Sequence, residues 1–309
     1  MGISKGFKMS VLAFLLLSLS LSTLEASNKV LKGKVRIDGS STVYPISEAI
    51  AEEFREVAPR VRVNIGVSGT GGGFKKFSVG EIDINDASRP IKGKEEKIAK
   101  KNKIEFVELA VAFDGLTVVI NKKNTWAKEI TTQELKKIWD KDSKVVTWAD
   151  VREGWPKRTI KLYGPGTDSG TFDYFTKAIN GKSGRSRSGY TKSEDDNVLV
   201  KGVVGNIDAM GYFGYAYYKA NKNVLQSVKV NGVAPTEDTI NKGVYKPLSR
   251  PIYIYVNKAS YKKAEVKRFV DFYLDKVGTI VPEVGYIALP SKTYQQQRDK
   301  LNSPKKMKK

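Results

Sequence analysis

Residues 166–175 read GTDSGTFDYF and stand where a strand gives way to a helix. The alternating residues 159–163 before them predict the strand, and Phe172, Phe175 and Ile179 recur at helical spacing. The first amides of a helix have no partner inside the helix and lie at the positive end of its dipole. Hydroxyl groups and a glycine at such a turn are suited to hold an anion. For one turn taken alone, an ordinary helix cap is the alternative.

Three further strand-to-helix turns are rich in Ser, Thr and Gly: GSSTV at 39–43, SGTGGG at 68–73 and DASR at 86–89. In open α/β sheets, ligands bind beyond the carboxyl ends of the strands. The four turns fall on both sides of the strand-like residues 116–120, which we interpret as a crossover into a second domain. Residues 251–256 are the corresponding returning strand. The pattern predicts an oxyanion site in a cleft between two α/β domains.

The composition limits the function classes. The chain has 309 residues, enough for about two domains. It contains no histidine and no cysteine, which excludes Ser-His-Asp and Cys-His catalysis and the usual zinc sites. No clustered carboxylates suggest a metal pair. We therefore predict a binding protein that is not an enzyme and has neither a cofactor nor a metal.

The formal net charge is +21. Such a field steers anions or binds nucleic acid or an acidic surface, and a lysine-rich solvated surface is the alternative. Aromatic and basic residues are not interleaved as in proteins that bind single strands, so we expect no nucleic acid partner.

The first residues are typical of an export signal. Lys5 and Lys8 precede a largely apolar run over 11–21, and Ala26 and Ser27 offer a small-residue cleavage point. The run is shorter than the roughly twenty residues of a membrane span. We predict a signal peptide over 1–26, cleaved near Ala26 or Ser27, and a soluble periplasmic protein. The chain has no lipobox cysteine. An uncleaved anchor is the alternative.

Six motifs carry a family resemblance: GSSTVYP at 39–45, SGTGGGFKKF at 68–77, ASRPI at 87–91, YGPGTDSGTFDYF at 163–175, SEDDNVLVKGV at 193–203 and GYFGYAYY at 211–218. With these motifs the mature chain closely resembles the periplasmic phosphate-binding proteins of phosphate ABC transporters, the PstS/SphX family. The resemblance implies a type II periplasmic binding fold, in which two α/β domains are joined by two crossover strands with the ligand cleft between them. Domain I is then 31–120 plus 251–292, domain II is 121–250, and 293–309 is a basic tail without ordered structure.

The resemblance also implies a function and a site. It implies a monomer that binds inorganic phosphate with high affinity and delivers it to the membrane permease subunits of an ABC transporter. The family's phosphate contacts fall on Ser41, Thr42, Val43, Thr70, Gly71, Ser88, Arg89, Ser169, Gly170 and Thr171.

Some family members have an aspartate where Arg89 stands, and that aspartate accepts the phosphate proton. Another acceptor is therefore needed in this chain, because a buried O–H without a partner is costly. Asp168, next to the predicted cradle, is our first candidate, and Asp195 and Asp196 follow.

Three other functions remain as alternatives to phosphate binding. A receptor for sulfate or molybdate differs in that its ligand brings no proton at neutral pH. A basic adhesin of the envelope predicts binding that is lost in salt. An envelope phosphatase is disfavoured by the absence of histidine and cysteine.

Overall fold

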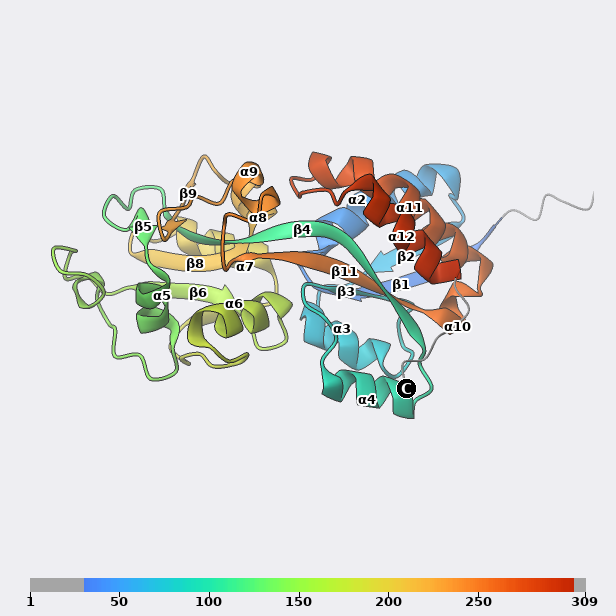
Figure 1. Cartoon of the computed structure of the whole chain (residues 1–309), viewed down its shortest axis with the longest axis horizontal. Coiled ribbons are helices and arrows are strands. Elements are labelled where there is room, and N and C mark those ends of the chain that lie inside the picture. The colour runs from blue at the N-terminus through green and yellow to red at the C-terminus, as the bar shows by residue number, and fades with distance from the viewer. Residues whose placement is uncertain (1–30, 303–309) are drawn as a thin grey trace, which may run out of the picture.

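The computed structural model describes residues 31–302, and two long strands run through the middle of this part (Figure 1). They are β4 (Phe106–Asn121) and β11 (Ser249–Asn257), which pair in antiparallel register. The second half of β4 turns to other partners, β8 (Ala209–Gly214) and β9 (Leu225–Ser227). The crossovers predicted at 116–120 and 251–256 lie within β4 and β11.

Lobe I denotes residues 31–105 and 258–302, on one side of the long strands. Three parallel strands and their helices form its first part: β1 (Gly33–Gly39), α2 (Tyr44–Val57), β2 (Val61–Ile65), α3 (Gly69–Phe77), β3 (Ile84–Ala87) and α4 (Gly93–Lys101). The chain returns to lobe I with α10 (Lys258–Tyr261), α11 (Ala264–Glu283) and α12 (Ser291–Asn302).

Lobe II denotes residues 122–248. Besides β8 and β9 it contains β5 (Glu129–Ile130), α5 (Thr132–Trp139), the short 3₁₀ helix η1 (Trp148–Asp150), β6 (Lys161–Pro165), α6 (Gly170–Asn180), β7 (Thr191–Ser193), α7 (Asp196–Val204), α8 (Tyr215–Ala220), β10 (Lys229–Val230) and α9 (Glu237–Asn241). The domain boundaries predicted from sequence stay a prediction. They place most of β4 and β11 in domain I and end that domain at 292, whereas the descriptive lobes leave both strands out and extend lobe I to 302.

The main sheet of the described residues runs in the order β2-β1-β3-β11-β4-β8-β6-β7. Within lobe I β1, β2 and β3 are parallel, and within lobe II β6, β7 and β8 are parallel. Parallel strands need crossover helices that return the chain to the same end of the sheet. The predicted turns at 39–43, 68–73 and 86–89 therefore gather at one sheet edge, and the turn at 166–171 follows the corresponding end of β6.

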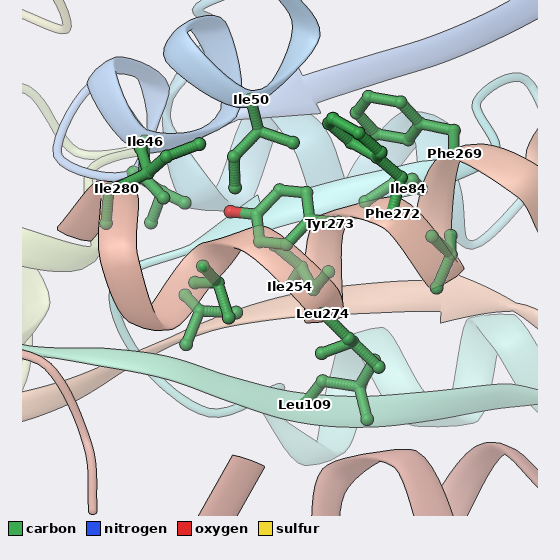
Figure 2. Packing of buried hydrophobic residues seen from close by; sticks show 14 of the residues in the cluster. Ile46, Ile50, Ile84, Leu109, Ile254, Phe269, Phe272, Tyr273, Leu274 and Ile280 are labelled. Carbon is green, nitrogen blue, oxygen red and sulfur yellow. The ribbon is translucent and has the colours of Figure 1, made fainter. Parts of the chain in front are cut away.

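The core of lobe I forms between α2, α11 and the sheet (Figure 2). Ile46, Ile50 and Phe54 repeat every four residues and give α2 one buried apolar face. Phe269 and Tyr273 of α11 lie on the facing side, and the Phe54 and Phe269 rings meet edge-on with centroids 5.2 Å apart. This packing fixes where α2 begins, and Thr42 lies just before its first turn.

Tryptophans form part of the core of lobe II. Trp139 and Trp148 are fully buried, and Trp139 contacts the rings of Phe175 and Tyr212. The Phe175 ring stacks on Tyr212 at 3.8 Å between centroids. Because Phe175 belongs to α6, this cluster anchors the helix whose start carries Ser169, Gly170 and Thr171.

The chain end departs from expectation. We expected no ordered structure over 293–309, but α12 forms a helix to Asn302. The reason is two buried side chains: the Tyr294 hydroxyl donates to the Val111 carbonyl at 2.8 Å, and Gln297 Oε1 accepts from the Ala110 amide at 3.2 Å. Both contacts hold α12 against β4. The predicted signal peptide and residues 303–309 lie outside the described residues. Within 31–302 no helix has the length and apolarity to cross a bilayer.

Asp83 connects three separate segments of lobe I through hydrogen bonds and ion pairs. Its side chain is fully buried and accepts from Arg36, Ser260 and Lys263. Burial raises the carboxyl pKa, but these hydrogen bonds outweigh it and lower the pKa to about 2. A lowered pKa in the folded state stabilises the protein above the unfolded value near 4, and this stability is lost as pH falls toward 2.

We predict that Asp83→Asn lowers the free energy of unfolding at pH 7 by about 2 kcal/mol. Urea unfolding from pH 7 to pH 2 measures it, and the difference from the unmodified protein should shrink below pH 4. A difference that stays constant down to pH 2 would show that the charge of Asp83 is not what stabilises lobe I.

Candidate anion-binding site

Hydroxyl groups from both lobes meet at the ends of the strands. Thr42 precedes α2 in lobe I and Thr171 is in the first turn of α6 in lobe II, and their Oγ1 atoms are 3.0 Å apart. On the lobe I side, Thr70 Oγ1 lies 3.2 Å from Ser88 Oγ and accepts from the Ser88 amide at 3.1 Å. All four side chains are almost completely buried. The predicted turns thus form one buried hydroxyl cluster.

The first turn of α6 presses against lobe I at Gly170. A Cβ atom at this position would lie 2.5 Å from Ser88 Oγ and 2.6 Å from Thr70 Oγ1. The Gly71 amide donates to the Asp168 carbonyl across the same boundary at 2.6 Å. Only a glycine leaves room for this approach. The predicted residues Thr70, Gly71, Ser88 and Gly170 are therefore brought together.

Some predicted amide donors have partners within the chain. The Thr42 amide donates to Ser40 Oγ at 3.2 Å, the Val43 amide to the Ser40 carbonyl at 3.1 Å and the Thr171 amide to Ser169 Oγ at 3.0 Å. Ser41 is buried, and its carbonyl accepts from the Tyr217 hydroxyl at 2.9 Å. Ser169 is the N-cap of α6. These amides are therefore already paired in this structure, which leaves the hydroxyls of the cluster as the candidates to bind an anion.

A buried arginine that the sequence did not single out joins this cluster. Arg250, at the start of β11, donates to Thr171 Oγ1 at 2.6 Å and to the Gly170 carbonyl at 3.0 Å. Its Nη2 is also 3.3 Å from Asp114 Oδ2, its register partner on β4. Its Nε has no partner among the described residues. A guanidinium beside Thr171 supplies the positive charge that an oxyanion site requires.

Arg89 holds a different place from the one expected. Its Nε donates to Asp173 at 2.7 Å, and its Nη atoms donate to Glu95 at 2.8 and 2.7 Å and to the Pro90 carbonyl at 3.0 Å. Each nitrogen of the guanidinium therefore has a partner from the chain itself. Arg89 lies next to Ser88, but its charge is matched by two carboxylates, whereas Arg250 lies in hydrogen-bond contact with the hydroxyls.

Asp168 is paired with a lysine and not with the cluster hydroxyls. Its carboxylate accepts from Lys75 Nζ at 3.0 and 2.8 Å, and its side chain is 39% exposed. Asp195 caps α7 by accepting the Asn197 amide at 2.9 Å. Of the three carboxylates considered from sequence, only Asp196 is almost fully buried, and its Oδ2 has no partner among residues 31–302.

Asp196 belongs to a group of buried charges around Arg250. Burial raises the pKa of the Asp196 carboxyl to about 8, Asp114 and Asp195 add repulsion, and Arg250 opposes the rise. Burial likewise raises the pKa of Asp114, again opposed by Arg250. The Arg250 guanidinium thus pairs with Asp114 and also attracts the Asp196 carboxyl. A site of this kind can hold an anion and one shared proton.

The described residues contain no group of His, Cys, Asp and Glu side chains arranged to hold a metal ion. Hydroxyls from several helix starts, a guanidinium and a buried carboxyl instead match the needs of a partly protonated tetrahedral oxyanion.

Comparison with known proteins agrees with this chemistry. A family model described as a PBP superfamily domain matches residues 25–277. The protein SphX of Synechococcus elongatus is 48% identical over 278 residues, which cover 88% of this chain and 82% of SphX. The chain belongs to the PstS/SphX family. The phosphate-binding protein PstS of Staphylococcus saprophyticus is 41% identical over 277 residues, 88% of this chain and 85% of that protein.

Solved structures give the same fold. The crystal structure of a possible phosphate-binding protein from Planctomyces limnophilus is 50% identical, with a TM-score of 0.65 over 88% of this chain and 98% of that one. A putative phosphate ABC transporter substrate-binding protein from Clostridium perfringens, solved with bound phosphate, is 27% identical. It gives a TM-score of 0.72 over 84% of this chain and 100% of that one. The predicted type II periplasmic binding fold of the PstS/SphX family is confirmed.

The close approach at Gly170 generates a test of the site geometry. We predict that Gly170→Ala holds the lobes apart, because its Cβ would overlap Ser88 and Thr70. Small-angle X-ray scattering should show a larger radius of gyration. Gly93→Ala is the matched control, since Gly93 is also the first residue of a helix and a Cβ there meets nothing within 4 Å. Identical scattering from both variants would contradict the close contact.

Proposed function

We propose that this chain binds inorganic phosphate and delivers it to the permease of a phosphate ABC transporter. The observation that carries the proposal is the meeting of Thr42, Thr171 and Arg250 between the lobes. The relatives named as phosphate-binding proteins and the phosphate-bound structural neighbour support the choice of ligand. The proposed site comprises the hydroxyls of Thr42, Thr70, Ser88 and Thr171 together with Arg250.

Family members are substrate-binding proteins of transporters, and we propose the same role here, without enzymatic activity. The buried hydroxyl cluster could offer a nucleophile. Histidine and cysteine are absent from the whole chain, however, so a histidine base or a thiol nucleophile is not available. Export by the predicted signal peptide and a location in the periplasm are part of this proposal. Delivery requires an opening motion about β4 and β11, the two strands that join the lobes.

Phosphate and sulfate differ in whether the bound ligand carries a proton, and a binding site can use this difference to select between them. Near neutral pH phosphate carries at least one O–H group, whereas sulfate carries none. A buried O–H needs an acceptor, and a carboxyl oxygen supplies one, most strongly when the carboxyl is ionised. In our proposal Asp196 takes this role in place of Asp168, because it is buried, has a free Oδ2 among the described residues and lies in the charge cluster around Arg250.

The raised pKa of Asp196 fixes the direction of a pH effect. With a pKa of about 8, the carboxyl is largely neutral below pH 8 and charged above it. A neutral Asp196 can donate to sulfate, whereas a charged one repels it. Phosphate above pH 8 is a dianion that still carries one O–H, which the charged Asp196 accepts. Discrimination against sulfate should therefore rise with pH.

We predict that sulfate affinity falls as pH rises from 6 to 9, while phosphate affinity is largely kept. In Asp196→Asn the sulfate affinity should become independent of pH, and phosphate should bind about tenfold or more weakly at pH 9. Calorimetry at several pH values measures both. Asp195→Asn is the control, because asparagine caps α7 almost as well, and losing the Asp195 charge should move the pH profile toward lower pH without abolishing it. The same pH profile in Asp196→Asn and the unmodified protein would remove Asp196 as the acceptor.

The two arginines give a second prediction. Arg250→Lys keeps the positive charge next to Asp114 but loses the planar fork that reaches Thr171 and Gly170 together. We expect phosphate affinity to fall by about ten- to a hundredfold, corresponding to roughly 1.5–3 kcal/mol. Calorimetry at pH 7.5 measures this loss. Unchanged affinity in Arg250→Lys would leave Arg89 as the arginine that binds the ligand.

A further inference from the structure

Asp173 of α6 forms a buried contact between the lobes. Its side chain is 6% exposed and accepts from Arg89 Nε at 2.7 Å and from Ser183 Oγ at 2.6 Å, while Lys92 Nζ lies 2.6 Å away. Arg89 and Lys92 belong to lobe I, and Asp173 and Ser183 belong to lobe II. Another ion pair between the lobes, Lys75 with Asp168, lies at the surface with Lys75 71% exposed. We call Arg89, Lys92, Glu95 and Asp173 the clasp.

The lobe I half of the clasp is held in place independently of lobe II. Glu95 binds Arg89 through both carboxylate oxygens, and the Pro90 carbonyl accepts from Arg89 Nη1. The guanidinium carbon also lies 5.4 Å from the centre of the Phe74 ring. These contacts come from the loop before α4, from α4 and from α3, all in lobe I. Arg89 is therefore already oriented when lobe II approaches, and Nε is left for Asp173.

The lobe II half of the clasp lies in the helix turn that forms the site. Asp173 is three residues after Gly170 and belongs to the first turn of α6. When Asp173 meets Arg89, the same rigid turn brings Gly170 against Ser88 and Thr70 and brings Thr171 to Thr42. Clasp formation and site closure are thus one movement.

Solvent reaches the clasp. Arg89, Lys92 and Asp173 line a groove of about 600 Å³ between the lobes, together with Tyr174, Lys177 and Pro247. An ion pair that leaves water on closing loses solvation and gains attraction, and the two effects nearly balance. Such a pair biases the lobes toward the closed form without locking them. The exposed Lys92, 45% accessible, also makes the bias sensitive to salt.

We propose that Asp173 is a positioning residue that sets how long the lobes stay closed around the ligand, through Arg89 and Lys92 and without touching the anion. The proposal rests on the proposed function for its ligand, phosphate. It gives the two arginines separate roles, because Arg89 stabilises the closed form and Arg250 faces the ligand. The contribution of the clasp lies mainly in the dissociation rate, because the ligand enters through the open form, in which the clasp is broken.

The test compares Asp173→Asn with Asp140→Asn in the mature chain. Asp140 makes an equally short ion pair, 2.7 Å to Arg185 Nε, and is similarly buried, but both partners lie in lobe II. Stopped-flow measurements with phosphate should show a dissociation rate raised on the order of tenfold in Asp173→Asn, with the association rate unchanged. Rising salt should speed dissociation from the unmodified protein more than from Asp173→Asn, which keeps the exposed Lys75–Asp168 pair between the lobes. Asp140→Asn should resemble the unmodified protein in rates and in salt response.

Scattering without phosphate separates the clasp from the ligand assignment. We expect a larger radius of gyration for Asp173→Asn than for Asp140→Asn, whether or not phosphate is the ligand. If the unmodified protein does not bind phosphate, the proposed function fails. The scattering comparison without phosphate then still tests whether the clasp holds the lobes together. Lys92→Ala, at an exposed position, gives the same comparison if Asp173→Asn does not fold. Equal radii, or equal dissociation rates in the two Asp variants, would overturn the proposal.

Discussion

The geometry of the candidate anion-binding site depends on the contacts that hold Arg250 in place. The register of β4 and β11 sets Arg250 opposite Asp114, and both side chains are almost completely buried. A buried charge is tolerated only with a partner, so this pair fixes the guanidinium at the place where the two lobes join. From there it reaches Thr171 and Gly170 in the first turn of α6. The positive charge of Arg250 therefore lies on a strand that joins the lobes and not on a turn of either lobe. A ligand bound between the two lobes can contact it there.

The first turn of α6 then combines several roles. Ser169 caps the helix, Gly170 allows the close approach, Thr171 contributes a hydroxyl and Asp173 reaches across to Arg89. The core of lobe II fixes this turn through its aromatic cluster, and the core of lobe I fixes α2 and the turn before it. Each core therefore acts as a rigid support. Relative movement is left to β4 and β11, which is the arrangement expected of a receptor that opens and closes.

Much of the fold could be predicted from the sequence, because strand-to-helix turns have a local signature of glycine and hydroxyl residues. The same signature found the four hydroxyl residues that the structure brings together: Thr42, Thr70, Ser88 and Thr171.

Arg250 was missed because its role comes from the long-range pairing of β4 and β11. The available signal was a pair of opposite charges in two mainly apolar strands, Asp114 in 106–121 and Arg250 in 249–257. The roles of Arg89 and Asp168 likewise depend on partners distant in sequence, Asp173 and Lys75, which local patterns do not reveal.

The central claim is that Arg250 faces the ligand while Arg89 holds the lobes together. The most direct measurement is a crystal structure of the mature protein grown with phosphate. We expect phosphate oxygens within about 3 Å of the Arg250 guanidinium and of the Thr171 hydroxyl. We also expect Arg89 to remain paired with Asp173 and Glu95. A complex in which Arg89 has left these carboxylates to bind phosphate, while Arg250 makes no contact with phosphate, would contradict these roles.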